Sequence, residues 1–81
     1  MSDERLQSIL DIMGELLADP VVPKNVKARI ENAMKALKEN KELKIKVNKA
    51  LDELDEIGDD TNMEPFTRSQ IWNLVSALEM L

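Results

Sequence analysis

The chain has 81 residues, of which 43% are hydrophobic and 33% charged, and it contains no Cys, no His and no Tyr. A chain of this length forms one domain, 1–81, near the lower limit at which a single hydrophobic core is sufficient. Without Cys and His, no disulfide framework and no thiolate or imidazole metal site is available, and the commonest general bases and nucleophiles of enzymes are missing. We therefore expect a compact, all-α, non-enzymatic protein with no cofactor and no small-molecule substrate.

The net charge of −5 conceals an uneven distribution along the chain. Residues 1–23 sum to −4, residues 24–49 to +6 and residues 50–81 to −7. A basic middle segment between two acidic ones can be neutralised within one small fold, and the alternative is an electrostatic surface for nucleic acid. The pattern favours internal neutralisation.

The N-terminal sequence MSDERLQSIL is acidic and lacks the basic patch followed by an apolar run of a secretory signal. No window of the chain approaches the ~18 uninterrupted apolar residues of a membrane span. These features predict a soluble, cytoplasmic protein that does not enter a membrane.

Apolar residues recur at steps of three and four in the first half of the chain and predict two helices, 3–18 and 24–39. Ser2 can cap the first helix, and Pro20 disfavours helical geometry at Asp19, so the sequence DPVVP ends it. Pro23 suits the start of the second helix. The predicted inward residues are Leu6, Ile9, Leu10, Met13, Leu16 and Leu17 in the first helix, and Val26, Ile30, Ala33, Met34 and Leu37 in the second.

The second half of the chain shows the same periodicity and predicts helices at 43–57 and 65–80. The break near Asn40 depends on one asparagine among charged residues, whereas Gly58 and Pro65 mark the end of the third helix and the start of the fourth. The predicted inward residues are Leu43, Val47, Ala50, Leu51, Leu54 and Ile57, followed by Ile71, Leu74, Val75 and Leu78.

The two halves of the chain match at an offset of about 41 residues, which is close to the period of HEAT-type repeats. Leu10 matches Leu51, Ile30 matches Ile71 and Leu37 matches Leu78. We therefore expect two repeated antiparallel helical hairpins, 3–39 and 43–80, packed as one four-helix bundle.

Four oxygen-bearing side chains, Asp59, Asp60, Asn62 and Glu64, follow the third predicted helix and resemble a calcium loop in composition. The loop lacks the Gly at position six and the bidentate Glu at position twelve of an EF-hand. Side-chain acceptors for turn and cap amides are the simpler explanation, so we expect no metal site.

The basic segment 24–49 is the candidate for weak, salt-dependent binding to RNA or the ribosome, through Lys24, Lys27, Lys35 and Lys38. These lysines spread over a broad helical face, and Glu31 and Glu39 lie four residues from Lys27 and Lys35, where they would offset part of the positive field. No aromatic residues are interleaved to stack on bases. This binding is therefore the alternative hypothesis.

Trp72, the only tryptophan, lies about 100° from the inward residue Ile71 on the helical wheel and marks the margin of the fourth helix. One interpretation makes it a large filler of the core, and the other makes it part of an interface. The chain also has more large apolar residues than four narrow stripes can bury, which is typical of a contact surface. Our hypothesis is a non-enzymatic protein-protein interaction module whose contact residues are Val22, Phe66, Trp72 and Met80, with a second copy (a dimer first of all) or another protein as partner.

The stretches DPVVPKNV at 19–26 and DTNMEPFTRSQIWNLVSALE at 60–79 resemble a family of short archaeal proteins catalogued as uncharacterised protein family number 0147. The resemblance covers nearly the whole chain. Lys24 stands where arginine is usual in the family, and Phe66 is an uncommon residue after the proline. The resemblance implies an all-helical bundle from an archaeal cytoplasm, and it implies no active site because the family has no assigned activity.

Overall fold

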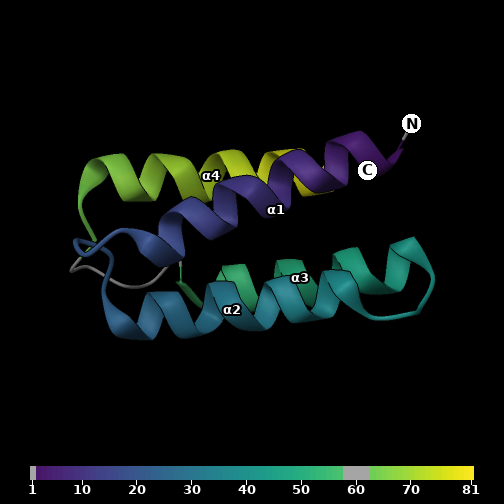
Figure 1. Cartoon of the computed structure of the whole chain (residues 1–81), viewed down its shortest axis with the longest axis horizontal. Helices are drawn as coiled ribbons and strands as arrows, with labels where there is room; N and C mark the ends of the chain where they lie inside the picture. The colour runs from purple at the N-terminus through teal and green to yellow at the C-terminus, as the bar shows by residue number, and fades with distance from the viewer. Residues whose placement is uncertain (1, 58–62) are drawn as a thin grey trace.

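A computed structural model describes residues 2–57 and 63–81, and within these ranges the chain is all-α (Figure 1). The helices are α1 (Ser2–Ala18), α2 (Lys24–Lys38), α3 (Leu43–Ile57) and α4 (Pro65–Glu79). Their bounds differ from the predicted ranges by no more than one residue at either end. The helices run alternately up and down, so the N- and C-termini lie at the same end of a bundle 33 × 20 × 18 Å in extent. The four-helix bundle is thus confirmed.

Each helix packs against two neighbours, in the cyclic order α1, α2, α3, α4, and the most extensive contact is between α2 and α3. Alanines permit this close approach: Ala33 and Ala36 of α2 and Ala50 of α3 are all buried. The two helices in closest contact belong to different predicted hairpins. Packing between the two predicted hairpins is therefore more extensive than packing within either of them. The repeat relationship between the halves stays a prediction.

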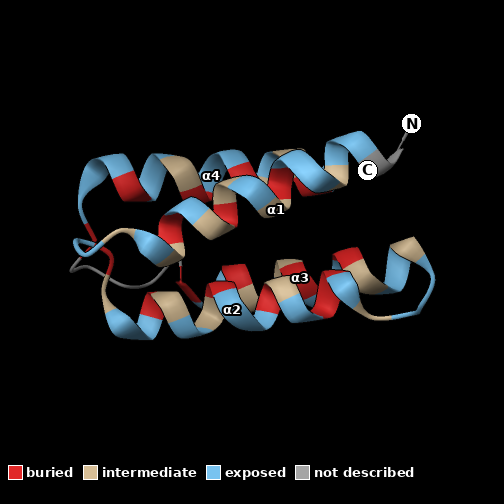
Figure 2. Ribbon diagram, in the orientation of Figure 1, coloured by how far each residue is buried: buried red, intermediate tan, exposed pale blue. Residues whose placement is uncertain are grey.

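The core is one continuous cluster to which all four helices contribute, and their buried residues face inward (Figure 2). Most of the predicted inward residues are buried. Seven of the 21 are only partly buried, because each apolar stripe is wider than the contact face and its outer members pack on the edge of the core. These seven are Leu6, Leu10, Leu17, Met34, Leu43, Leu51 and Val75. The core residues are Ile9, Met13, Leu16, Val22, Val26, Ile30, Ala33, Leu37, Val47, Ala50, Leu54, Ile57, Met63, Ile71, Leu74 and Leu78.

The connection between α1 and α2 is a tight turn at the sequence Asp-Pro-Val-Val. The Asp19 Oδ1 accepts a hydrogen bond from the backbone N–H of Val21 at 2.9 Å, and the Asp19 carbonyl accepts one from the N–H of Val22 at 3.2 Å. This turn places Val21 in solvent and turns Val22 inward, where it is only 3% exposed. The predicted role of Val22 in a contact surface is therefore wrong, because the turn uses this side chain to close one end of the core.

The predicted break near Asn40 is present. Lys38 ends α2 because Glu39 adopts extended geometry, with φ −69° and ψ 153°, and α3 starts at Leu43. The carboxylate of Glu39 then binds Lys41 at 3.0 Å and Lys49 at 3.1 Å. A single side chain thus links the end of α2, the turn and the second turn of α3.

The other helix starts agree with their prolines. Pro65 is the first residue of α4, where its missing N–H costs no helical hydrogen bond, and Pro23 directly precedes α2. The N–H of Lys27 donates to the Pro23 carbonyl at 3.0 Å. The predicted Gly58 terminus and the predicted Ser2 cap involve residues or side chains outside the described part of the chain.

Candidate functional site

Helix α4 differs from the other helices in the composition of its outer face. Of its 15 residues only Arg68 and Glu79 are charged, whereas six of 15 are charged in α2 and seven of 15 in α3. The inward positions of α4 are occupied by Thr67, Ile71, Leu74 and Leu78, all of which are buried. The outer face of α4 therefore carries almost no charge, whether it is exposed to water or covered by a partner.

Three large apolar side chains lie on this helix or directly after it, and all three are exposed. The exposed fraction is 66% for Phe66, 63% for Trp72 and 74% for Met80. Trp72 follows the buried Ile71 by one residue, so its side chain emerges about 100° from the core-facing direction. The core-filling interpretation of Trp72 is therefore wrong: within one subunit the indole lies at the surface.

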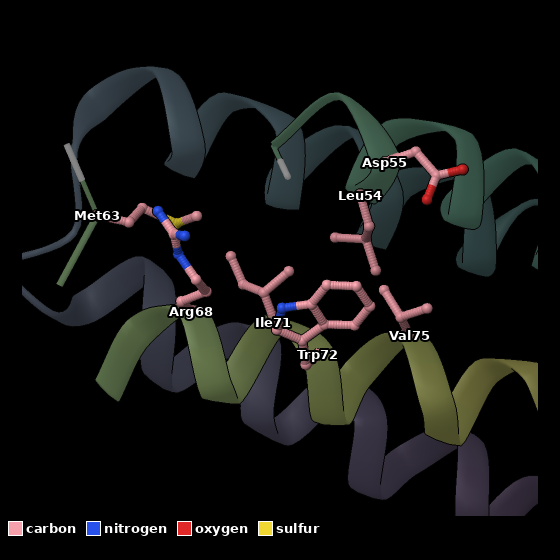
Figure 3. Close-up of a pocket in the computed structure, with 7 residues that line it drawn as sticks. All are labelled: Leu54, Asp55, Met63, Arg68, Ile71, Trp72 and Val75. Atoms are coloured by element: carbon pink, nitrogen blue, oxygen red, sulfur yellow. The ribbon is translucent and has the colours of Figure 1, made fainter. Parts of the chain in front are cut away.

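Trp72 borders a groove of about 340 Å³ between α3 and α4 (Figure 3). In the close-up the indole lies beside Ile71 and Val75, while Leu54 projects from α3 toward the same space. Asp55 and Arg68 are the charged residues among those that line it. The groove is lined by Leu54, Asp55, Met63, Arg68, Ile71, Trp72 and Val75.

Met80 borders a second groove, of about 370 Å³, on the opposite side of α4, where the helix meets α1. Its lining includes Ile9 and Ile12 of α1 together with Ala77. The two grooves lie on opposite sides of α4, so the outer face of this helix, with Phe66, Trp72 and Met80, forms a ridge between them. A partner that covered this ridge would place its own side chains in both grooves.

The basic segment has a different character, because several of its charges are paired within the chain. Arg29 binds Glu53 at 3.1 Å and Glu56 at 3.6 Å, which connects α2 to α3. Lys35 binds Glu31 at 3.4 Å. Neither (i, i+4) pair predicted for α2 is formed: Glu31 pairs with Lys35 instead of Lys27, and Glu39 pairs with Lys41 and Lys49 instead of Lys35.

Glu39 shows how these pairings change an acid. Hydrogen bonds from Lys41 and from Lys49 lower the pKa of its carboxyl below the ordinary value.

The predicted RNA contacts lie at the surface of α2. Three of the four, Lys24, Lys35 and Lys38, are exposed, and Lys27 is partly buried. The structure therefore brings these lysines to a surface but does not gather them into a cleft.

Among residues 4–57 and 63–81 no cluster of three or more Asp, Glu, His or Cys side chains could hold a metal ion. Asp59, Asp60 and Asn62 of the considered calcium loop lie outside the described residues, and Glu64 is exposed. Across the same described ranges no helix is long and apolar enough to cross a membrane.

Sequence reasoning missed two buried residues that position α4. Met63, at 6% exposed, packs under the start of the helix, and Thr67, at 2%, occupies its first inward position. Thr67 lies four residues before Ile71 and continues the inward stripe, so spacing could have identified it in spite of its hydroxyl group. Met63 precedes the helix and had no periodic signal.

The family resemblance is supported by three comparisons. The whole chain, residues 1–81, matches the Uncharacterised protein family (UPF0147). A UPF0147 protein of Methanocaldococcus jannaschii is 41% identical over 78 residues, which cover 95% of this chain and 84% of that protein. A UPF0147 protein of Pyrococcus abyssi is 36% identical over 85 residues, covering 100% of this chain and 99% of that protein.

The fold is also similar to a solved structure. The crystal structure of the unknown function protein MMP1188 superimposes with a TM-score of 0.95 and 38% sequence identity, covering 100% of this chain and 93% of that one. Both the sequence and the arrangement of helices are thus shared over the full length. The chain belongs to the Uncharacterised protein family (UPF0147).

Proposed function

We propose that this protein is a non-enzymatic helical interaction module that self-associates through the outer face of α4. The observation that carries the proposal is the combination of exposed Phe66, Trp72 and Met80 with the near absence of charge on that helix. Protein interfaces are depleted in charged residues at their centre and enriched in aromatic residues, Met and Arg. The face of α4 has this composition in a chain of which a third is charged.

The absence of His, Cys and Tyr from the sequence agrees with a binding role. The serines of α4, Ser69 and Ser76, are exposed, and no histidine exists in the chain to activate them. Large apolar groups in water are unfavourable, and contact with a partner is what would recover the free energy of their burial.

A self-association surface also explains why the three most exposed large apolar residues, Phe66, Trp72 and Met80, lie on α4 or directly after it, whereas Val21 and Ile45 are exposed singly elsewhere. Dimers related by a two-fold axis bury the same patch on both subunits, so one ridge is sufficient for closed assembly. The alternative, binding to RNA through the basic segment, has less support because Arg29, Lys35, Lys41 and Lys49 are engaged with carboxylates.

Sedimentation equilibrium tests the proposal directly. We expect a mass above the 9.2 kDa of one chain at micromolar protein concentration, with little change between low and high salt. Trp72 is the only tryptophan, so its fluorescence emission should shift to shorter wavelength as the protein is concentrated. A 9.2-kDa species at every concentration, or assembly only with added RNA at low salt, would refute the proposal.

A further inference from the structure

The outermost stripe of α4 has a symmetric arrangement along the helix. Its residues recur at steps of three and four, so they share one line on the surface. Met80, the C-cap residue, keeps right-handed helical geometry and extends the line. All five residues are exposed and uncharged, and they are Phe66, Ser69, Asn73, Ser76 and Met80.

Asn73 is the centre of this stripe. Phe66 and Met80 are equally distant from it along the helix, and Ser69 and Ser76 are nearly so. The order is therefore large, small, Asn, small, large. Reversing the direction of the helix leaves that pattern of sizes unchanged.

We infer that the partner at this face is a second copy of the same chain, with the two α4 helices antiparallel about a two-fold axis next to Asn73. The inference rests on the proposed self-association and specifies its geometry. In this arrangement Phe66 packs on Met80 of the partner subunit, a pairing in which the thioether contacts the ring. The small Ser69 and Ser76 let the helices approach between these contacts.

Asn73 suits the position on the axis. An amide side chain has both an acceptor oxygen and donor hydrogens, so it can hydrogen-bond to Asn73 of the partner subunit. An amide pair at the axis, between the apolar contacts of Phe66 with Met80, favours one register and orientation of the pair, because any shift leaves the amides unpaired.

The two charged residues of α4 supply an independent argument. Arg68, Trp72 and Glu79 lie on the margin of α4 that faces α3, since Arg68 and Trp72 line one α3–α4 groove and Glu79 lines another. In an antiparallel pair each margin lies beside the same margin of the other copy. Arg68 then lies within ~1.5 Å, along the helix axis, of the level of Glu79 of the partner subunit.

This charge complementarity occurs twice in the dimer, once at each end. It is lost in a parallel pair, where the margins that carry Arg68 and Glu79 lie on opposite sides of the helix contact. Trp72 lies one residue from the axis and comes next to Trp72 of the partner subunit. The antiparallel pair therefore covers the exposed aromatic groups and brings opposite charges together.

Cysteine cross-linking tests the geometry, because the chain has no native Cys. Ser69→Cys and Ser76→Cys are nearly isosteric changes at exposed positions, so the fold should be retained. In the inferred dimer Ser69 is ~12 Å along the axis from its own copy and ~1.5 Å from the level of Ser76 of the partner subunit. A disulfide needs Cα atoms closer than about 7 Å.

Mixing the two variants under oxidised glutathione should therefore shift most of the protein to a covalent dimer, whereas each variant alone should stay largely monomeric on a denaturing gel. Asn73→Cys should cross-link to itself, and Asn32→Cys, at an exposed asparagine of α2, is the matched control that should not.

Efficient self-cross-linking of Ser69→Cys would show a parallel pair and overturn the inference. Cross-linking of Asn32→Cys without the α4 variants would assign the interface to α2 and overturn it as well. Sedimentation of the same variants separates the two levels: an assembly heavier than one chain with the wrong cross-links refutes only the geometry, whereas a monomer refutes the proposed function.

Discussion

The α2–α3 pair and the ridge of α4 are built on the same apolar periodicity but present opposite outer surfaces. The α2–α3 pair packs closely through alanines and covers its outside with charges, several of them joined by ion pairs such as Arg29 with Glu53. Helix α4 buries a similar inward stripe yet exposes Phe66 and Trp72. The inward stripe determines the fold, so information about partners lies in the outward face.

The two surfaces also differ in the free energy that it costs to remove them from water. Exposed ion pairs gain little by excluding water, and charged surfaces resist burial because desolvation is costly. A neutral face with aromatic side chains has no such cost. We therefore expect the α2–α3 surface to stay solvated in a dimer and the ridge of α4 to become buried.

The largest expected effect separates the core from the ridge. Leu37→Ala, at a residue 1% exposed on α2, should lower the free energy of unfolding by ~2–5 kcal/mol, because it leaves a cavity in the core. Phe66→Ala should change it by about 0.5 kcal/mol or less, as is usual for a surface position. Urea unfolding at protein concentrations low enough to keep the chain monomeric measures both.

An equal loss in the two variants would contradict the comparison, since it would mean that Phe66 is covered within its own subunit. The Leu37 variant serves as the reference for what a buried side chain is worth in this small domain.

The second prediction concerns Trp72. Trp72→Ala should weaken self-association by at least about 2 kcal/mol, or roughly 30-fold in Kd, as expected for an aromatic residue central to an interface. Ile45→Ala is the matched control, because Ile45 is a large apolar residue that is 49% exposed on α3, away from the ridge. A dilution series followed by sedimentation velocity gives both dissociation constants.

If Ile45→Ala weakened assembly as much as Trp72→Ala, the contact surface would include α3 and the assigned face would be wrong. If neither variant changed the Kd, the exposed aromatic group would have no part in assembly.

Much of this comparison could be predicted from the sequence. The four helices and most of the core follow from apolar spacing, which is a local property: Ile30 and Leu74 lie on one side of any helix built from their segments. The same wheel placed Trp72 at a margin, which left a core-filling and an interface position both open; its exposure is shown only by the packed structure. The sequence also showed that the middle of the chain is basic.

The errors arise from packing between segments. Val22 seemed available for contacts because it lies in a proline-rich connection, but the hydrogen bonds of Asp19 turn its side chain into the core. Leu10 and Leu51 fit their stripes, yet neighbouring helices cover them only in part. The partners of Glu39 could not be predicted either, because Lys49 approaches it only after α2 and α3 have packed.

The third prediction tests the charged surface. Arg29→Gln removes the pairs with Glu53 and Glu56 and should destabilise the fold by ~0.2–1 kcal/mol at low ionic strength, with a smaller loss in salt. The side chain of Arg29 is 44% exposed, so solvent screens the interaction. A double-mutant cycle with Glu53→Gln isolates the coupling, and self-association should be unchanged in the same variants.

Loss of the dimer in Arg29→Gln would place an assembly contact on the α2–α3 surface and reverse the comparison. A coupling energy that did not fall with added salt would show that this pair is more deeply buried than its exposure indicates.

The smallest effect is expected at Glu39, in the turn between α2 and α3. Hydrogen bonds from Lys41 and Lys49 hold the pKa of this carboxyl below its ordinary value, because both favour the carboxylate form. A pKa that is lower in the folded than in the unfolded chain stabilises the fold above the unfolded pKa, and this contribution is lost as the pH falls through the folded pKa.

Lys49→Gln should therefore raise the pKa of Glu39 in an NMR pH titration and weaken the acid-side decline of stability. Lys35→Gln should leave that pKa unchanged, because Lys35 pairs with Glu31. If the titration of Glu39 were unaltered in both Lys41→Gln and Lys49→Gln, the turn would be held by its backbone alone. The charges of the α2–α3 surface around Glu39 would then be solvated separately and not ion-paired.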